Sequence, residues 1–189
     1  MKLDDGKYVF QRFLTDDAGR PILVFRQQID WILGSGNHAR TYLYQTSAGE
    51  LYQVPIAWYS EEQRWGMAPG YDRPDHEGVT RRVRRECLFC HNAYPEVARQ
   101  SDTYGASQTF PHRLPHGIGC QRCHGPGADH VQFHTAGTTT EADIVNPAKL
   151  KSDLRDDVCN QCHLQPSVAL FGVRRFGREA CTIMTADRA

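Results

Sequence analysis

The stretch CQRCHGPGADH, residues 120–130, contains the pattern C-x-x-C-H, and shorter copies stand at 87–91 (CLFCH) and 159–163 (CNQCH). On one turn of helix, residues i, i+3 and i+4 share a face. Two thiols on that face can bond the two vinyl groups of a haem while the next imidazole reaches the iron, so the pattern is typical of covalent c-type haem attachment. With 7 Cys and 9 His in 189 residues, chance would give only about 0.01 such pentapeptides. We therefore predict three c-type haems.

Each predicted haem takes two thioether bonds and a proximal histidine from its motif. The thioether cysteines are Cys87, Cys90, Cys120, Cys123, Cys159 and Cys162, and the proximal histidines are His91, His124 and His163. Zinc is the alternative, because C-x-x-C pairs also form structural zinc sites. A zinc site normally uses two such pairs, so three pairs would leave one pair without a partner. A zinc site also gives no reason for a histidine directly after the second cysteine of every pair. Cys181 stands outside the motifs, and it is either an idle thiol or a contact to another copy of the chain.

Six histidines remain as candidates for the distal side of the haems. The chain has only 3 Met, so the sequence favours bis-histidine coordination and low reduction potentials. His130 follows the turn at 125–127, which directs it toward a neighbouring haem. His38 follows two glycines and precedes a predicted strand, and His76 lies in a loop bounded by proline. The other three stay open as candidates: His112, His116 and His134.

The hydrophobic pattern predicts a mixed fold with little regular secondary structure. An antiparallel β meander comes first and a region of short helices and loops follows. The expected strands are 7–14, 21–33, 39–46 and 51–59, a Gly- and Pro-rich loop covers 65–79, and helical segments are expected at the three motifs, at 128–135 and at 148–157. Residues 1–80 would form a haem-free scaffold and residues 81–189 the three-haem region.

Arginines at 81, 82, 84 and 85 stand directly before the first motif. They form either a solvated helix face or a set of partners for haem propionates, which Arg binds through two parallel hydrogen bonds. Overall, 22 basic residues balance 22 acidic ones without a long basic run, so the composition gives no support for nucleic-acid binding.

Neither a membrane-spanning segment nor a signal peptide is expected. No run reaches the roughly 18 apolar residues that a spanning helix needs, and Asp4 and Asp5 follow Met1 closely where a signal peptide would be apolar. Because c-type haem is attached outside the cytoplasm, we expect an exported protein, periplasmic or extracellular, and the sequence as a mature form or a fragment.

The segment CQRCHGPGADHV (120–131), with DIVNPAKL (143–150) and VCNQCHLQ (158–165), resembles the multihaem cytochromes grouped with the tetrahaem electron carrier of ammonia oxidisers and hydroxylamine oxidoreductase. LGSGNHARTYL (33–43), PGYDRPDH (69–76) and CLFCHNAYP (87–95) extend the similarity. The resemblance implies that His130 serves a neighbouring haem and that His38 is a further distal ligand. Relatives usually carry another C-x-x-C-H before the β region, and this chain has none.

These observations predict an electron-transfer protein that is not an enzyme and that exchanges electrons with redox partner proteins. A variant is a homopolymer, a conductive extracellular filament with haem contacts between subunits, since open head-to-tail contacts give filaments. The alternative is a haem enzyme in which one open iron acts on a small nitrogen or oxygen compound.

Overall fold

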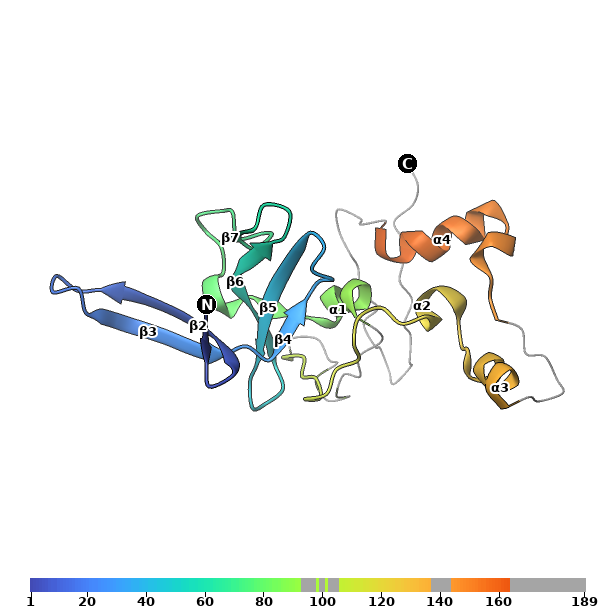
Figure 1. The fold of residues 1–189 in the computed structure, drawn as a ribbon, viewed down its shortest axis with the longest axis horizontal. Helices are drawn as coiled ribbons and strands as arrows, with labels where there is room; N and C mark the ends of the chain where they lie inside the picture. The colour runs from blue at the N-terminus through green and yellow to red at the C-terminus, as the bar shows by residue number, and fades with distance from the viewer. Residues whose placement is uncertain (93–97, 99–100, 102–105, 137–143, 164–189) are drawn as a thin grey trace.

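The computed structural model describes residues 1–92, 98, 101, 106–136 and 144–163. Strands gather in the N-terminal half, and short helices follow along an elongated molecule (Figure 1). The predicted fold class, an antiparallel β region followed by short helices, is confirmed. No helix in the described part of the chain has the length and apolar character to cross a membrane.

The first sheet is a three-stranded antiparallel ribbon. Its order is β1 (Lys2–Asp4), β2 (Lys7–Thr15) and β3 (Pro21–Gln28). The β2–β3 turn is held by Asp16, whose Oδ1 accepts hydrogen bonds from the backbone N–H groups of Ala18 and Arg20. Beyond its base this hairpin projects away from the body of the molecule (Figure 1).

The second sheet forms the body of the β region. It runs in the order β4 (Trp31–Leu33), β5 (Ala39–Gln45), β6 (Leu51–Tyr59) and β7 (Arg64–Met67), and β8 (Arg82–Val83) also pairs with β6. The predicted hairpin at 39–46 and 51–59 is present as β5 and β6. The two sheets share a cluster of buried side chains, namely Phe10, Ile29, Tyr42, Tyr44 and Val54.

Two expectations for the β region were wrong in detail. The single strand expected at 21–33 is divided into β3 and β4, because Asp30 turns the chain into the second sheet and its Oδ2 accepts a hydrogen bond from the Gln45 backbone N–H. The loop expected at 65–79 begins with β7, which pairs Trp65 with Trp58 across the sheet at a ring separation of 5.4 Å. Such cross-strand aromatic pairs stabilise a hairpin.

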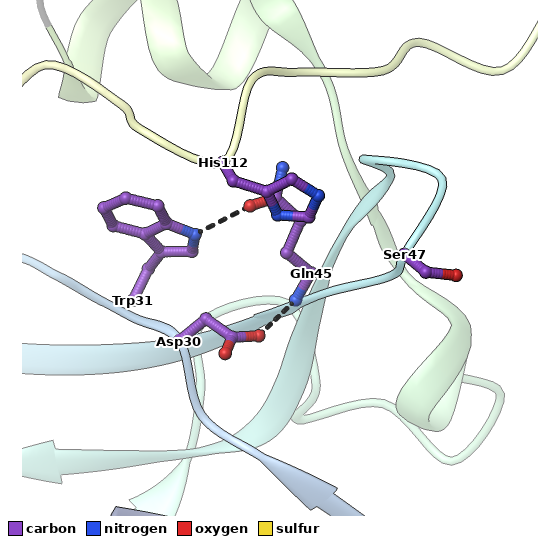
Figure 2. Close-up of a pocket in the computed structure, with 5 residues that line it drawn as sticks. All are labelled: Asp30, Trp31, Gln45, Ser47 and His112. Carbon is purple, nitrogen blue, oxygen red and sulfur yellow. Dashed lines mark hydrogen bonds between the residues drawn. The ribbon is translucent and has the colours of Figure 1, made fainter.

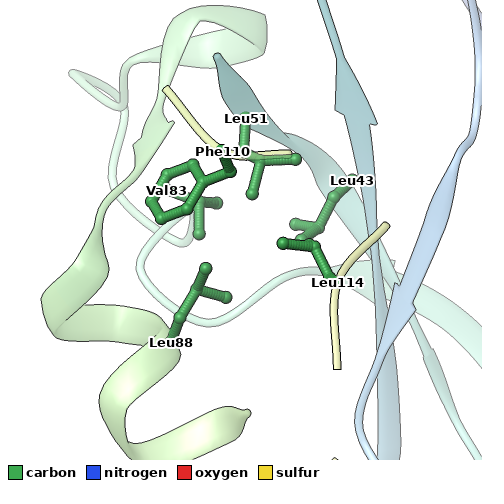
Figure 3. Packing of buried hydrophobic residues seen from close by; sticks show 6 residues of the cluster. All are labelled: Leu43, Leu51, Val83, Leu88, Phe110 and Leu114. Carbon is green, nitrogen blue, oxygen red and sulfur yellow. The ribbon is translucent and has the colours of Figure 1, made fainter. Parts of the chain in front are cut away.

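One buried cluster joins the β region to the start of the helical region (Figure 3). Leu88 of α1 (Arg85–His91) is fully buried in it. Its other buried members are Leu43, Leu51, Val83, Phe110 and Leu114. The cluster contains residues from both sides of the division predicted at 80/81. The division into a scaffold at 1–80 and a three-haem region at 81–189 stays a prediction.

The remaining helices are short. They are α2 (Gln121–His124), α3 (Ala128–Ala136) and α4 (Ser152–His163), with the 3-10 turns η1 (Gly78–Thr80) and η3 (Pro147–Lys149). The helix expected at 128–135 is present as α3. The helical approach expected from residue 148 begins as η3, where Asn146 Oδ1 accepts a hydrogen bond from the Ala148 N–H, and α4 starts at Ser152.

Candidate haem-binding site

Each C-x-x-C-H motif lies on a helix of the described region. Cys87, Cys90 and His91 lie on α1, the second motif spans the N-cap residue Cys120 and α2, and the third occupies the last turn of α4. The helical spacing is visible in the second motif, where the His124 N–H donates to the Cys120 carbonyl at 3.0 Å. The spacing therefore places each pair of cysteines and its histidine on one helix face, as covalent attachment requires.

The six motif thiols are accessible to a ligand. Four of the cysteines are exposed and two, Cys90 and Cys162, are half-buried. Burial and the neighbouring Cys162 thiol raise the pKa of the Cys90 thiol, whereas the charge of Arg122 acts in the opposite direction. The second cysteines of the first and third motifs are thus close neighbours, so haems attached there would also be neighbours.

His124 is held in an orientation suited to an axial ligand. Its Nδ1 lies 2.7 Å from the Val145 carbonyl oxygen, and the Val145 N–H donates to the His124 carbonyl at 3.2 Å. A histidine that binds a metal usually donates its second ring N–H to a carbonyl or carboxylate, which fixes the tautomer. Nδ1–H donation to Val145 leaves Nε2 with a lone pair for iron.

The three motifs meet through their middle residues. Arg122 of the second motif donates from Nη2 to the Phe89 carbonyl of the first motif at 2.6 Å. Gln161 of the third motif donates from Nε2 to the Arg122 carbonyl at 3.0 Å. Phe89, Arg122 and Gln161 all stand directly before the second cysteine of their motifs, so the attachment segments converge on one point.

His38, a predicted distal ligand, lies directly before β5, and its Nδ1 is 2.7 Å from Glu61 Oε1. The side chain is 84% exposed, so solvent or a ligand can reach the imidazole. Ser60 supports this loop from the β6–β7 turn, since its hydroxyl donates to the Gly36 carbonyl and its N–H donates to the His38 carbonyl. The carboxylate on Nδ1 is again the arrangement of a metal-binding histidine.

His76 has a different hydrogen bond. Its Nδ1 accepts from the Gly78 N–H at 3.0 Å, and its ring lies edge-on to the Tyr71 ring. A neutral imidazole that accepts at Nδ1 carries its proton on Nε2. To bind iron through Nε2, His76 would have to give up this bond, which makes it a poorer candidate than His38.

The other candidates lie around the helices. His130 is half-buried on α3, and its ring packs edge-on against His134 one turn later, with the centroids 4.6 Å apart. His116 is exposed. His112 lines a small polar hollow over β4 and β5 (Figure 2). The other residues of this hollow are Asp30, Trp31, Gln45 and Ser47. Trp31 Nε1–H donates to Gln45 Oε1, and the Gln45 backbone N–H donates to Asp30 Oδ2, so these residues of the hollow stabilise the fold.

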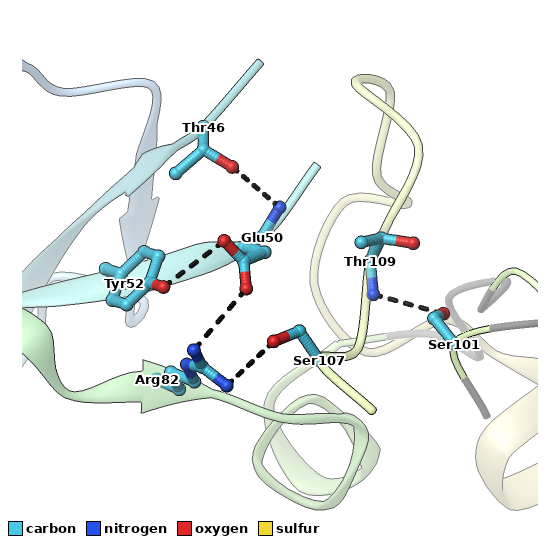
Figure 4. A network of polar contacts seen from close by, with 7 residues as sticks. All are labelled: Thr46, Glu50, Tyr52, Arg82, Ser101, Ser107 and Thr109. Carbon is cyan, nitrogen blue, oxygen red and sulfur yellow. Dashed lines mark hydrogen bonds and ion pairs between the residues drawn. The ribbon is translucent and has the colours of Figure 1, made fainter. Parts of the chain in front are cut away.

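Part of the arginine cluster is committed to the β scaffold. Arg81 donates to the Pro69 carbonyl at 2.8 Å and lies over the Tyr71 ring. Arg82 binds the Ser107 hydroxyl at 2.8 Å and forms an ion pair with Glu50 (Figure 4). The solvated helix face is wrong for these two residues, because Arg81 follows η1 and Arg82 lies in β8. Arg84, exposed at the N-cap of α1, is better placed to meet a propionate.

The residues present fit covalent haem. Helices α3 and α4 contain no buried residue, yet most helix stability in proteins comes from packing of an apolar face. Val131 and Leu154 on these helices, with Val145 beside His124, are about half exposed, at 58%, 51% and 44%. A porphyrin attached at the motifs would cover apolar side chains of this kind.

Zinc fits less well. A structural zinc site gathers four protein ligands around one point. Across the described ranges, no group of three or more His, Cys, Asp or Glu side chains is arranged to hold a metal ion. Haem needs only one or two protein ligands for each iron, because the porphyrin nitrogens fill the equatorial positions.

Among solved structures, the chain is similar to the outer cell wall cytochrome OcwA, with 20% sequence identity and a TM-score of 0.42. The match covers 69% of this chain and 24% of that one, so this chain spans about a quarter of the length of that protein. No family model matches the sequence, and no curated protein matches it.

Proposed function

We propose that the protein is a multihaem c-type cytochrome that carries electrons through three covalently bound haems. The observation that carries the proposal is the convergence of three helical C-x-x-C-H motifs through Phe89, Arg122 and Gln161. When bound, the haems supply one-electron redox chemistry at iron. Electron tunnelling falls steeply with distance, so attachment segments that touch one another suit transfer between haems.

The chain's own residues would attach, orient and separate the haems. The motif cysteines would form the thioethers, and His91, His124 and His163 would be the proximal ligands of the iron. His38 and His130 are the preferred distal ligands, with His76 third. With histidine on both sides the potentials would be low.

The test is a haem count. We expect the pyridine haemochrome spectrum of the exported protein to give three haems per chain. The intact mass should exceed the polypeptide mass by three haem groups and should survive denaturation, because thioether bonds are covalent. A colourless protein of bare polypeptide mass that binds zinc would overturn the proposal.

The same proposal places the protein in the periplasm or outside the cell, where c-type haem is attached, with redox proteins as partners. We also propose head-to-tail assembly into a conductive filament, in which the exposed His38 side chain would serve a haem of the next copy. Electron microscopy of purified holoprotein checks the assembly. Particles that stay small and uniform under all conditions would remove the filament and leave the electron carrier.

The alternative is a haem enzyme with one open iron. Optical and paramagnetic resonance spectra separate the two functions. We expect low-spin signals from all three haems of a carrier, whereas a high-spin ferric signal from one haem would favour catalysis on a small nitrogen or oxygen compound.

A further inference from the structure

Arg122 is buried to an extent that is unusual for arginine. Only 6% of the residue is exposed, whereas arginine is almost never fully buried unless it is paired. It stands inside the second motif, directly before Cys123, so it lies in the segment that would bond a haem. Because this charge is buried, it cannot serve to keep the surface soluble, and its contacts must account for it.

The guanidinium of Arg122 connects the second motif to the end of α1. Its Nη2 donates to the Phe89 carbonyl at 2.6 Å and to the Asn92 carbonyl at 3.3 Å. Its central carbon lies 4.3 Å from the centre of the Phe89 ring. Carbonyls at a helix C-terminus carry partial negative charge, which favours a cation there.

The backbone of Arg122 connects the second motif to the third. Gln161 Nε2 donates both to the Arg122 carbonyl at 3.0 Å and to the Val158 carbonyl at 2.7 Å. One residue therefore contacts both of the other attachment segments, with its side chain on one side and its main chain on the other.

We propose that Arg122 is a positioning residue that fixes the three haem-attachment segments relative to one another and, through its permanent positive charge, raises the reduction potential of the haems around it. This inference rests on the proposed function. Ferric haem carries one more positive charge than ferrous haem, so a nearby cation stabilises the reduced form. Burial strengthens the effect, because a buried charge is screened far less than an exposed one.

The test compares Arg122→Met with Arg122→Lys and with Arg155→Met in redox titrations of the holoprotein. Arg155 is a matched control, because it lies on α4 beside the third motif but is 53% exposed and pairs with Asp156. In Arg122→Met, we expect at least one haem to shift tenfold or more toward the oxidised form at a fixed potential, which is 59 mV for one electron. Arg122→Lys should keep wild-type potentials and lower the melting temperature, and Arg155→Met should shift the equilibrium by less than twofold.

The outcomes separate this inference from the proposed function. Wild-type protein without covalent haem overturns the proposed function. If wild type carries three haems, two results overturn the role of Arg122 and leave the proposed function standing. One is that Arg122→Met does not change the reduction potentials, and the other is that Arg155→Met shifts them as much as Arg122→Met does. If Arg122→Met does not fold, Arg122→Gln, which removes the charge but keeps a polar side chain, replaces it in the comparison. Lower reduction potentials in Arg122→Gln support the role of the charge, and unchanged potentials overturn it.

Discussion

The hydrogen bonds of single histidines add to what the motifs and loops alone indicate about ligands for iron. His38 and His124 each present Nδ1 to an oxygen acceptor, at 2.7 Å in both cases. His76 accepts a hydrogen bond at the same atom. A histidine that binds iron through Nε2 needs a lone pair on that atom. The hydrogen bonds of His38 and His124 therefore fit the ligand roles that we propose for them, and the hydrogen bond of His76 does not.

Glu61 provides a test at the same scale. We expect Glu61→Ala to leave the His38 ring without its orienting carboxylate and to weaken its bond to iron by about 10- to 100-fold, as is typical when such a partner is lost. Paramagnetic resonance should then show a high-spin ferric fraction. Glu62→Ala is the control, since Glu62 pairs with Arg64 in the same turn at 2.9 Å. If the spectra of Glu61→Ala stay low-spin and unchanged, Glu61 does not position His38 as a ligand of iron.

Tyr71 gives a pH dependence. It is fully buried, its hydroxyl donates to the Gln53 carbonyl at 2.8 Å, and burial raises its pKa to about 12. A raised pKa means that the folded protein favours the protonated phenol. This contribution is complete below the ordinary pKa near 10 and is lost as the pH rises toward about 12. The free energy of unfolding should therefore fall across this window.

Denaturant titrations between pH 9 and pH 12 measure this fall. Tyr71→Phe should make the fall less steep, at a cost of about 1 kcal/mol from the lost hydrogen bond. A part of the fall should remain, because burial also raises the pKa of Tyr42 and of Tyr44. Tyr8→Phe, a substitution at a half-exposed tyrosine, should keep the full fall. Equal pH slopes in wild type and Tyr71→Phe would contradict the assignment.

At the scale of elements, the sequence predicts what local signals encode. The hairpin at β5 and β6, α3 and the three motif helices all follow from patterns within about ten residues. β8 was missed, since its two residues are a strand only by pairing with β6 some 30 residues earlier. The C-x-x-C-H motifs are also local, and their helical conformation could be predicted from the sequence. The contacts of Glu61 with His38, of Val145 with His124 and of Arg122 with Phe89 could not, because each joins residues that lie 21 to 33 positions apart along the chain.

The β5–β6 turn supports the segment that leads to the second motif. Gly49 has φ +93°, its carbonyl accepts from the Phe110 N–H at 2.9 Å, and an added Cβ would lie 2.7 Å from the Phe110 carbonyl oxygen. We expect Gly49→Ala to destabilise the protein by about 2 to 4 kcal/mol, which combines left-handed strain with a backbone clash. Thermal unfolding measures the loss.

Gly19 is the matched control for this substitution. It also has a left-handed backbone, with φ +76°, but a Cβ there meets nothing within 4 Å. Gly19→Ala should cost only the strain, about 1 kcal/mol. If both substitutions cost the same, the contact with Phe110 does not stabilise the turn.

At the scale of the whole molecule, the shared core sets how the β region and the attachment region unfold. Leu88 lies one residue after Cys87 and is fully buried among side chains from β5, β6 and β8. Leu88→Ala should lower the free energy of unfolding by about 2 to 5 kcal/mol. Because the cluster joins both regions, the far-ultraviolet signal of the sheet and the visible absorption of the haems should shift to lower temperature together.

Leu14→Ala, at a 56% exposed position on the projecting hairpin, is the control and should change stability by less than about 0.5 kcal/mol. A haem transition that falls in Leu88→Ala while the sheet transition stays in place would show two independent units. That result would support a domain boundary at 80/81. If both transitions instead shift together, the β scaffold and α1 unfold as one cooperative unit. In the second case the β scaffold that carries His38 also holds α1 in place, and α1 carries His91, the proximal ligand that we propose for the first haem.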